Sequence, residues 1–570
     1  MKAKPVAKKA SAKAKAVAKK PVAKKPVAKK PVAKKPVAKK ATAKKPVAKK
    51  PVAKKPVAKK PVAKKPVAKK PVAKKPVAKK ATAKTPVAKT PVAKKPTATK
   101  PVAKTKSAGG ASSASPRSGH AVHERLRAIA EHAIACAKRL GVDTAEVSVA
   151  TGHELEVSVR QGQVELVKEA GSSGLSVRII CAGRVATSST TDLQPDAVES
   201  FLARAVEMAS VSEPDEMAAP PSRRELARTW PVLDLFDPVT DGIDAAAAIE
   251  MATRAEAAAL AYDPRISASE GASFGRSSGH SVLATTSGFM GERGGTYQSL
   301  VVQAVADDVG GKKRNGVHWS GGRFFAELDD AEAVGREAAR RAVRHLGAQK
   351  IATAVLPVVF DKDAARGIIG LLAGCVLGDA IYRERSYLAQ RLGTRVASEL
   401  VTIVDDPLVP RGPGSRAFDG EGRPVQRRTV VAGGKLETFL LDTYSARKLD
   451  MAPTGSASGG GGIPHASTSN LFLLAGEHTP AQLLEGITRG LYVERMMGFG
   501  FDPTTGNFSR GAEGFLIEDG KLTTPISEIT ISRNLDDLLQ GIDRVADDLD
   551  HRTATASPSF RVDQMTVAGS

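Results

Sequence analysis

The chain has 570 residues and a formal net charge of +28 at pH 7. This charge is unevenly divided, because residues 1–118 contain 39 Lys, one Arg and no acidic residue, whereas residues 119–570 contain 47 basic and 59 acidic residues, a net charge of −12. The division excludes a uniformly basic globular protein and predicts a polycationic segment joined to an acidic body long enough for two or three domains.

The cysteine residues and the hydropathy of the sequence indicate the cellular compartment in which the protein is expected. Cys136, Cys181 and Cys375 have no CxxC spacing, which argues against a disulfide framework and fits a reducing environment. The longest apolar run, near residues 367–378, is too short and too rich in glycine to span a bilayer. The basic N-terminus is not followed by the apolar region of a secretory signal. We therefore expect a cytoplasmic protein with no membrane partner.

The first segment is a low-complexity repeat. PVAKK occurs thirteen times between residues 5 and 95, with variants such as ATAKK and PVAKT. A proline at every fifth residue prevents a stable helix, and the composition offers few side chains for a core. We therefore expect residues 1–118 to be disordered, with a linker rich in Gly and Ser at 107–119 before the folded body.

Evenly spaced lysines without aromatic residues suit contacts with phosphate groups rather than with bases. The composition resembles the lysine-rich tails of histone-like proteins, so the sequence predicts non-specific nucleic-acid binding and association with the nucleoid. The alternatives are a solubilising arm, an arm that folds back onto the acidic body, and contact with anionic lipid. The representative contact residues are Lys8, Lys9, Lys24, Lys25, Lys29, Lys30, Lys49, Lys50, Lys69 and Lys70.

The acidic body begins with a predicted α+β unit. Residues 120–140 have helical periodicity, and alternating apolar and polar residues over 145–189 predict four or five antiparallel strands. A helix at about 195–209 follows, and we assign 119–212 to an N-terminal domain. The predicted turns between the strands lie at or near Gly152, Gly162, Gly171 and Gly183.

A proline-rich connection at 213–238 leads to the middle segment. The pattern predicts an Ala-rich helix at about 243–261 and strands over 266–288 and 297–307. A helix at about 328–346 ends this segment, which we interpret as a middle α/β domain at 237–346.

The last segment opens with a predicted strand at 352–360 and a buried helix at 366–381. Gly433-Gly434 and Asp519-Gly520 predict β-hairpins. Most of the remaining sequence reads as strands, so we predict a largely β C-terminal domain at 351–570. The body as a whole is therefore expected to have an α+β fold.

No zinc-binding pattern is found in the sequence. Two histidines and a carboxylate on one helix bind zinc and activate water in HExxH proteins. His123-Glu124 and His153-Glu154 begin like this motif, but no histidine follows four or five residues later. His120 and His123 are three residues apart beside the linker, where the start of a surface helix is the simpler interpretation. We therefore predict no metal ligand and no catalytic residue on this chain.

Two serine motifs favour structural interpretations. Gly271-Ala272-Ser273-Phe274-Gly275 matches GxSxG, but a nucleophile elbow needs a strand-to-helix turn and the strand pattern continues on both sides. We interpret it as a β-turn. Ser445-Ala446-Arg447-Lys448 matches SxxK, but the companion motifs are missing, so a structural turn is expected there.

The loop at 453–470, PTGSASGGGGIPHASTSN, is the most unusual segment of the body. Successive glycines let backbone amides approach a ligand closely, or allow a mobile flap. The loop lacks the GK[ST] ending of a phosphate-binding loop. For His465 an exposed loop position is the alternative to substrate contact. The predicted substrate-cavity residues are Gly459, Gly460, Gly461, Gly462, His465 and Asn470.

Long motifs in the C-terminal half resemble one protein family. LLDTYSARKLDMAPTGSASGG, the stretch from LLEGITRG to ISRNLDDLL, and the closing MTVAG are similar to the TldD/PmbA family, and in particular to its PmbA branch, also called TldE. ATTSGFMGERGGTYQSL and the strands after residue 145 extend the resemblance over about 145–570. The Lys-rich segment lies outside it.

The resemblance implies a pairing of two homologous subunits. TldD carries zinc on HExxxH and a distal cysteine, and its PmbA/TldE partner does not; together they act as a cytosolic metalloprotease on unfolded or extended peptides. Counting back from VASELVTIVDDP places the HExxxH segment near Ile368–Ala373, where both imidazoles and the glutamate are absent. The resemblance therefore implies a helix that packs rather than one that activates water.

These inferences predict a PmbA/TldE-like, non-metal subunit of a heteromeric zinc peptidase. The expected partners are a TldD-like subunit that supplies zinc, a peptide substrate, and nucleic acid through the Lys-rich segment. We expect the loop 453–470 and the segment 494–514 to help enclose the peptide, with exposed strand edges pairing with it. The alternative is a nucleoid-associated DNA-binding or docking protein with no role in proteolysis.

Overall fold

The computed structural model describes residues 117–460 and 462–569. Residues 1–116 and Gly461 lie outside this part, and with them nearly all of the segment predicted to be disordered. The helices are α1 (Arg117–Arg139), α2 (Pro195–Ser210), α3 (Pro238–Asp241), α4 (Ala245–Leu260), α5 (Ala331–Arg344), α6 (Lys362–Cys375), α7 (Gly378–Tyr382), α8 (Thr443–Lys448) and α9 (Leu535–Gln540).

The strands of the first half form one sheet and those of the second half form the others. The first six are β1 (Thr144–Arg160), β2 (Gln163–Cys181), β3 (Arg184–Thr190), β4 (Ile266–Thr285), β5 (Met290–Asp307) and β6 (Lys313–Gly322). The next seven are β7 (Ala354–Phe360), β8 (Ile403–Asp405), β9 (Arg428–Ala432), β10 (Lys435–Leu436), β11 (Ala457–Ser458), β12 (His465–Ala466) and β13 (Leu471–Leu473). The last seven are β14 (Arg489–Met497), β15 (Phe501–Asp502), β16 (Asn507–Glu518), β17 (Lys521–Asn534), β18 (Ile542–Val545), β19 (Thr555–Ala556) and β20 (Phe560–Ala568).

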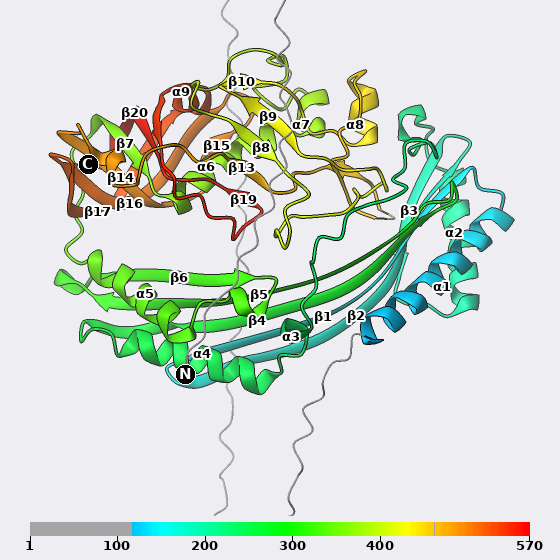
Figure 1. The fold of residues 1–570 in the computed structure, drawn as a ribbon, viewed down its shortest axis with the longest axis horizontal. Coiled ribbons are helices and arrows are strands. Elements are labelled where there is room, and N and C mark those ends of the chain that lie inside the picture. The colour runs from blue at the N-terminus through cyan, green and yellow to red at the C-terminus, as the bar shows by residue number, and fades with distance from the viewer. Residues whose placement is uncertain (1–116, 461, 570) are drawn as a thin grey trace, which may run out of the picture. The chain divides into compact units, whose positions relative to one another are not determined.

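The predicted α+β fold is confirmed. The first six strands form one antiparallel sheet in the order β3-β2-β1-β4-β5-β6, so that β1 and β4 join the predicted N-terminal and middle segments. The sheet lies along one side of the folded body, opposite the C-terminal elements (Figure 1). The domain boundaries stay a prediction, but the two segments share a continuous sheet.

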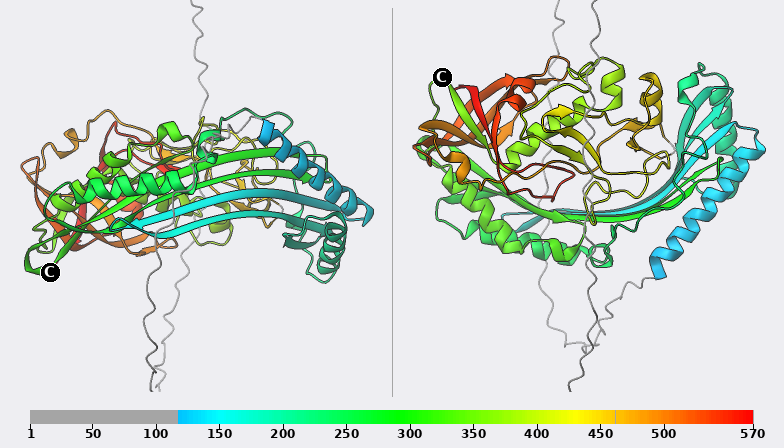
Figure 2. Two further views of the ribbon diagram at one scale, coloured as in Figure 1. Left: turned by 90° about the horizontal axis from the view of Figure 1, so that it is seen from below. Right: turned by 45° about the horizontal axis from the view of Figure 1, so that its top comes forward.

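Helices cover one face of this sheet. Successive side chains of a strand point to opposite faces, and in β1 Val147, Val149, Leu155, Val157 and Val159 are all buried on the same face. At one end of the sheet this face packs against α1 and α2, and at the other end against α4 and α5. Figure 2 shows these helices on the face away from the C-terminal elements. The opposite, inner face carries small polar residues such as Ser148, Ser158 and Ser273.

The predicted helices of the first half are confirmed, but the strand count is not. Three long strands replace the four or five expected, because Gly152 and Gly171 lie inside β1 and β2 rather than at turns. A Cβ on Gly171 would lie 3.5 Å from the His153 ring, an ordinary van der Waals distance, so the strand geometry does not require glycine at this position. Gly162 and Gly183 do sit at turns, with φ of 70° and 71°.

The GxSxG motif also lies inside a strand. Ser273 is in the middle of β4, where its hydroxyl donates to Ser158 Oγ at 3.3 Å. The predicted β-turn is therefore wrong. The irregularity is a bulge between Ser269 and Gly271, and Gly271 has φ of 122°. A nucleophile elbow is excluded because the chain continues as strand on both sides of Ser273.

The C-terminal half is largely β, as predicted. β14 pairs with both β7 and β16, and β7-β20-β17-β16 complete a closed ring of strands that leaves β15 and β18 as additions. Closure removes free edges from the ring. A five-stranded sheet in the order β10-β9-β8-β13-β19 lies beside it. The hairpins at Gly433-Gly434 and Asp519-Gly520 are confirmed, with positive φ at all four residues.

The predicted helix at 366–381 is divided into α6 and α7. Asp361 is the N-cap of α6 and accepts a hydrogen bond from the Asp363 amide at 3.0 Å. The helix ends at Cys375 because Leu440 takes over the next backbone bonds: its amide donates to Val376 O at 3.0 Å, and its carbonyl accepts from Gly378 N at 2.9 Å. None of the described helices is long and apolar enough to cross a membrane.

Candidate functional site

Helix α6 has one buried face and one open face. Ile368, Ile369 and Leu372 are buried in the C-terminal core, together with Cys375. The open face of α6 carries Gly370 and Gly374, which are exposed and about one helical turn apart. A Cβ on Gly370 or Gly374 would meet no atom within 4 Å, so both positions face open space.

The residues of α6 do not fit a catalytic zinc ion. A zinc ligand must present an imidazole, thiolate or carboxylate, and the open face of α6 offers only hydrogen, methylene and methyl groups. Cys375 is the one thiol on the helix, and it is buried; burial raises its pKa to about 12, so it stays protonated. The open face of α6 therefore offers no ligand for a zinc ion.

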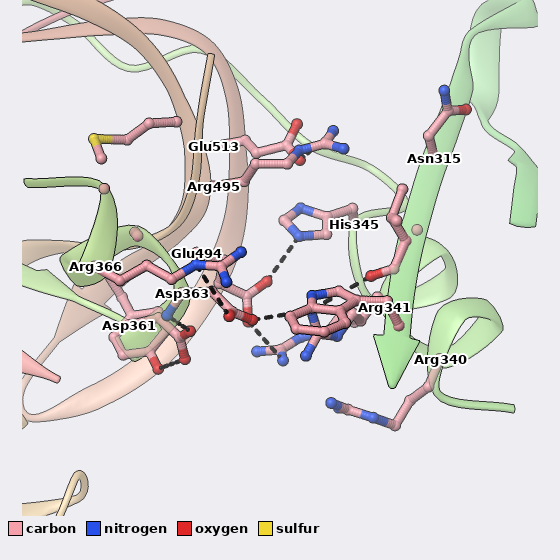
Figure 3. A pocket seen from close by; sticks show the side chains of 18 of the residues that line it. Asn315, Arg340, Arg341, His345, Asp361, Asp363, Arg366, Glu494, Arg495 and Glu513 are labelled. Atoms are coloured by element: carbon pink, nitrogen blue, oxygen red, sulfur yellow. Dashed lines mark hydrogen bonds and ion pairs between the residues drawn. The ribbon is translucent and has the colours of Figure 1, made fainter. Parts of the chain in front are cut away.

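A cavity of about 460 Å³ lies at the N-terminal end of α6. Its walls come from β6 and α5 on one side and from β14, β16 and the start of α6 on the other (Figure 3). The charged lining residues are Arg340, Arg341, Arg344, His345, Asp361, Asp363, Arg366, Glu494, Arg495, Arg510 and Glu513. Six arginines face four carboxylates, so the cavity carries an excess of positive charge. We call it the arginine cavity.

A histidine–glutamate pair spans the arginine cavity. His345 Nε2 lies 2.9 Å from Glu494 Oε2, and Arg344 forms an ion pair with the other oxygen of Glu494 at 2.8 Å. The His345 side chain is 8% exposed, and its Nδ1 has no hydrogen-bond partner among the described residues. Figure 3 shows His345 reaching toward Glu494 from the α5 side. The carboxylate therefore orients the ring and leaves one ring nitrogen free.

Asp361 connects α6 to the neighbouring strand β14. Besides capping α6, it accepts a hydrogen bond from the Tyr492 hydroxyl at 2.9 Å. Burial raises the pKa of the Asp361 carboxyl, with the neighbouring charges of Asp363 and Glu494 acting in the same direction. Burial also raises the pKa of Tyr492, so the phenol keeps its proton and remains a donor. These contacts fix the position of α6 against β14.

The sequence-predicted cavity residues lie elsewhere. Asn470 is 4% exposed, and its amide is used in three contacts: it accepts from Gly414 N and donates to Asp406 O and Ser415 Oγ. His465 is exposed, and its ring lies 2.7 Å from Ser458 Oγ. Gly459, Gly460 and Gly462 belong to the β11–β12 hairpin loop, and Gly461 lies outside the described residues. Of the described members, none lines the arginine cavity.

The segment 494–514 does line the arginine cavity, through Glu494, Arg495, Met496, Arg510 and Glu513. The SxxK motif does not form a site. Ser445 is buried in α8, not in the predicted turn, and donates to Asp442, the N-cap of that helix. Lys448 is exposed and lies over the Tyr444 ring instead. No pairing of a serine nucleophile with a lysine base results.

The histidines beside the linker meet residues far away in sequence. His123 Nε2 lies 3.2 Å from His280 Nδ1, and both line a second cavity of about 710 Å³ with Trp230 and Arg293. His120 is exposed and pairs with Glu124 at 3.2 Å. The predicted surface helix start therefore holds for His120, whereas the half-buried His123 belongs to a packing site that the sequence did not indicate.

One other group of potential ligands occurs among the described residues. His132, Cys136 and Glu199 place one donor atom each within 4.8 Å of one another on α1 and α2. The Arg139 guanidinium already contacts both Cys136 Sγ, at 3.2 Å, and Glu199. Desolvation raises the pKa of the Cys136 thiol. A cation placed there would therefore meet a fixed positive charge and a protonated thiol.

Asp419 and Glu421 are two neighbouring buried carboxyl groups. Glu421 is 1% exposed and accepts from Thr443 N at 2.9 Å and from Thr443 Oγ1 at 2.6 Å. Burial, with the nearby charge of Asp419, raises the pKa of Glu421 to about 8. Asp419 accepts backbone bonds from Glu421 and Arg423, which organise the turn before β9.

Comparison with known proteins agrees with this arrangement. The chain is 35% identical over 450 residues to metalloprotease PmbA of Escherichia coli O157:H7, an alignment that covers 78% of this chain and 97% of that protein. The chain belongs to the PmbA/TldD family. Family models of the PmbA/TldA metallopeptidase match three segments: domain 1 at 145–209, the central domain at 239–346 and the C-terminal domain at 353–569.

Other PmbA/TldD relatives place the chain nearer to PmbA than to TldD. A PmbA homologue of Haemophilus influenzae is 33% identical and covers 79% of this chain and 97% of its own length. A TldD homologue of the same species is 29% identical but covers 47% of this chain and 61% of its own. A model of a histone H1-like nucleoprotein matches residues 1–153, which include the Lys-rich segment.

Solved structures share the fold. A chain from Bacteroides thetaiotaomicron, named as a modulator of DNA gyrase, is 26% identical with a TM-score of 0.73, covering 78% of this chain and 99% of that one. TldE from Thermococcus kodakarensis is 20% identical with a TM-score of 0.69, covering 77% and 100%. The latter shows the fold of a PmbA/TldD protein.

The arginine cavity was missed by sequence reasoning. One signal was available: REAARRAVRH at 336–345 places Arg340, Arg341, Arg344 and His345 together at the C-terminal end of a helix. Three arginines and a histidine so close together are unusual on a surface helix. Their acidic partners Glu494 and Asp363 lie on other elements, which only the fold brings beside this helix.

Proposed function

We propose that the folded body is the non-metal subunit of a heteromeric zinc peptidase of the PmbA/TldD family. The supporting observation is the segment Ile368–Ala373 of α6, which contains no histidine and no carboxylate where the resemblance places HExxxH in TldD. A TldD-like partner would supply the zinc and the activating glutamate. No step of the hydrolysis is assigned to this chain.

This chain would contribute binding surface for an unfolded or extended peptide. The arginine cavity adjoins the open face of α6, and the segment 494–514 forms one of its walls. β6 is an edge strand of the large sheet and lies on the opposite wall. Its Val317 carbonyl accepts from Arg341 at 3.4 Å. An edge strand beside a cavity favours pairing with an extended peptide, which would compete with this side-chain contact.

Reconstitution tests this proposal. The purified chain should not cleave an unfolded protein such as reduced casein, whereas a mixture with a TldD-like subunit from the same host should cleave it in a chelator-sensitive reaction. As a matched control, the TldD-like subunit is measured alone. Cleavage by this chain alone at the rate of the mixture would contradict the proposal.

A second function is supported by a separate observation. The match of residues 1–153 to a histone H1-like nucleoprotein, together with 39 lysines in residues 1–118, favours non-specific DNA binding by the Lys-rich segment. In the alternative function, the chain is a nucleoid-associated DNA-binding or docking protein whose body has no role in proteolysis. The two functions are compatible in one molecule.

DNA binding is tested with duplexes of unrelated sequence. We expect the full chain to bind them equally, with affinity falling steeply as salt is raised from 50 to 200 mM, because binding of this kind releases counterions. Residues 119–570, with their net charge of −12, should not bind. If the full and shortened proteins bind DNA with equal affinity, the binding site lies in the body. If neither protein binds, the proposed DNA binding is wrong.

A further inference from the structure

The arginine cavity contains one arginine that lacks an acidic partner. Arg340 and Arg341 pair with Glu337, Arg344 with Glu494, Arg366 with Asp363, and Arg495 with Glu513. Arg510 alone among the six has no carboxylate within 4.0 Å in the described part of the chain. The charge of Arg510 is therefore not balanced by any carboxylate among the described residues.

The position of Arg510 makes this lack unfavourable. Alternate residues of a strand share a face, and Arg510 projects from the face of β16 that also carries the buried Phe508 and Ala512. Its guanidinium lies 5.9 Å from the centre of the Phe508 ring, and its Nε is buried without a hydrogen-bond partner. A partly desolvated charge without a counterion costs free energy that an incoming anion would recover.

Neighbouring groups are also incompletely bonded. Arg495 Nε is buried without a partner, and so is His345 Nδ1 on a side chain that is 8% exposed. Unsatisfied buried groups are uncommon in proteins and mark sites that a ligand or water completes. Three such atoms belong to residues that line this one cavity.

The charge balance limits the kind of anion. Six arginines against the four lining carboxylates and Glu337, which pairs with Arg340 and Arg341, leave a positive excess of one. A multiply charged phosphate would be repelled by Asp361, Asp363, Glu494 and Glu513, whereas a single carboxylate matches both the excess and the planar fork of a guanidinium. A volume of about 460 Å³ is within the usual range for a small ligand or a short stretch of peptide.

We propose that the arginine cavity binds a carboxylate of a peptide ligand, with Arg510 as the principal contact and Arg495 and His345 as its supports. The carboxylate is either the C-terminal group or an acidic side chain. This inference rests on the proposed function in taking the ligand to be a peptide. It gives the non-metal subunit a role in selecting or aligning the substrate.

Fluorescence polarisation with the purified full chain tests the inference. Three N-terminally labelled probes are compared: penta-alanine with a free C-terminus, its C-terminal amide, and the amide with a central glutamate. Salt is kept constant, because the Lys-rich segment also attracts anions. Tighter binding of the free acid assigns the site to a terminal carboxylate, and tighter binding of the glutamate probe assigns it to an acidic side chain. Equal binding of all three overturns the inference.

Variants locate the site. Arg510→Gln should weaken binding of the preferred probe about tenfold to a hundredfold, the usual effect of losing a charge-assisted hydrogen bond, and leave the neutral amide unchanged. Arg510→Lys, which keeps the charge and loses the fork, should give an intermediate loss. Arg336→Gln on α5, exposed and paired with Glu332, removes the same charge outside the cavity and should bind like the unmodified chain. If Arg510→Gln binds like the control, the inference is wrong.

The outcomes separate this inference from the proposed function. Binding is measured without a partner subunit, so preference for a carboxylate without any cleavage in the reconstituted mixture contradicts the proposed function alone. If the mixture cleaves all three probes equally and the chain shows no preference for a carboxylate in binding, this inference alone is contradicted. Circular dichroism of each variant confirms that the fold is retained, and the probe comparison on the unmodified chain needs no variant.

Discussion

At the residue scale, Glu421 is a buried group that makes the free energy of unfolding depend on pH. Its pKa of about 8 lies above its ordinary value of 4.5, so the folded protein holds this proton more tightly than the unfolded chain does. The free energy of unfolding should therefore fall as pH rises from about 4.5 to about 8, by at most about 1.4 kcal/mol per pH unit, and then level off.

Glu421→Gln tests this dependence, because glutamine resembles the protonated acid at every pH. The variant should match the unmodified protein near pH 5 and be more stable at pH 9, as measured by urea unfolding at several pH values. Glu399→Gln, a change at a side chain that is 76% exposed, is the control and should leave the pH profile unchanged. A profile of Glu421→Gln that parallels the unmodified protein would contradict the assignment.

Asn470 and His465 are expected to behave differently although both come from the predicted ligand loop. Asn470→Ala removes three hydrogen bonds at a buried position and should lower the free energy of unfolding by about 1–3 kcal/mol. His465→Ala removes an exposed ring and should change it by less than about 0.5 kcal/mol. Thermal unfolding of both variants checks this; a larger loss for His465→Ala would reverse the interpretation.

Residue-scale prediction from sequence was limited by contacts between distant segments. The absence of HExxxH near Ile368–Ala373 could be read directly, because it depends on residue identity alone. The predicted role of Asn470 in a substrate cavity stays a prediction, but the partners of its amide, Gly414 and Ser415, lie about 55 residues earlier in the chain and could not be read from the loop itself. The pairing of His123 with His280 likewise depends on β4 lying beside α1.

At the element scale, α6 combines a face that stabilises the core with a face that does not. Ile369→Ala, at a fully buried position, should lower the free energy of unfolding by about 2–5 kcal/mol. Gly370→Ala, at an exposed helical position with nothing within 4 Å, should raise it by about 0.5–1 kcal/mol.

The comparison of these two neighbouring variants by urea unfolding tests the assignment of the faces. Ala373 already shows that alanine is compatible with this helix, so neither change should affect secondary structure measured by circular dichroism. If Gly370→Ala lowers the free energy of unfolding, the open face of α6 is covered in solution, for example by a bound partner or by a second copy of this chain.

Helices were predicted more accurately than strands for a physical reason. Caps such as Asp244 and Asp330 and an apolar stripe are local features, and α4 and α5 lie close to their expected positions. Glycine inside a strand has no distinct local signature, so Gly152 and Gly171 were assigned to turns. The end of α6 depends on bonds to Leu440, 65 residues beyond Cys375, which no local pattern encodes.

At the scale of the whole molecule, the sequence alone did not predict that the N-terminal and middle segments share one sheet. The two hairpin-rich segments at 145–189 and 266–307 each looked sufficient for a small domain, yet β1 pairs with β4 along fourteen residues and joins them. The division of charge, in contrast, needed no structure, and the composition alone distinguishes the Lys-rich segment from the acidic body.

The account depends most on the claim that this PmbA/TldD chain contributes shape and charge to a peptidase and takes its metal from a partner. Metal analysis of the full chain, purified without chelators from its native host and separated from any TldD-like subunit, measures this directly. We expect less than one zinc per chain and no chelator-sensitive cleavage of peptides. One tightly bound zinc per isolated chain, held by its own side chains and accompanied by cleavage, would contradict the account.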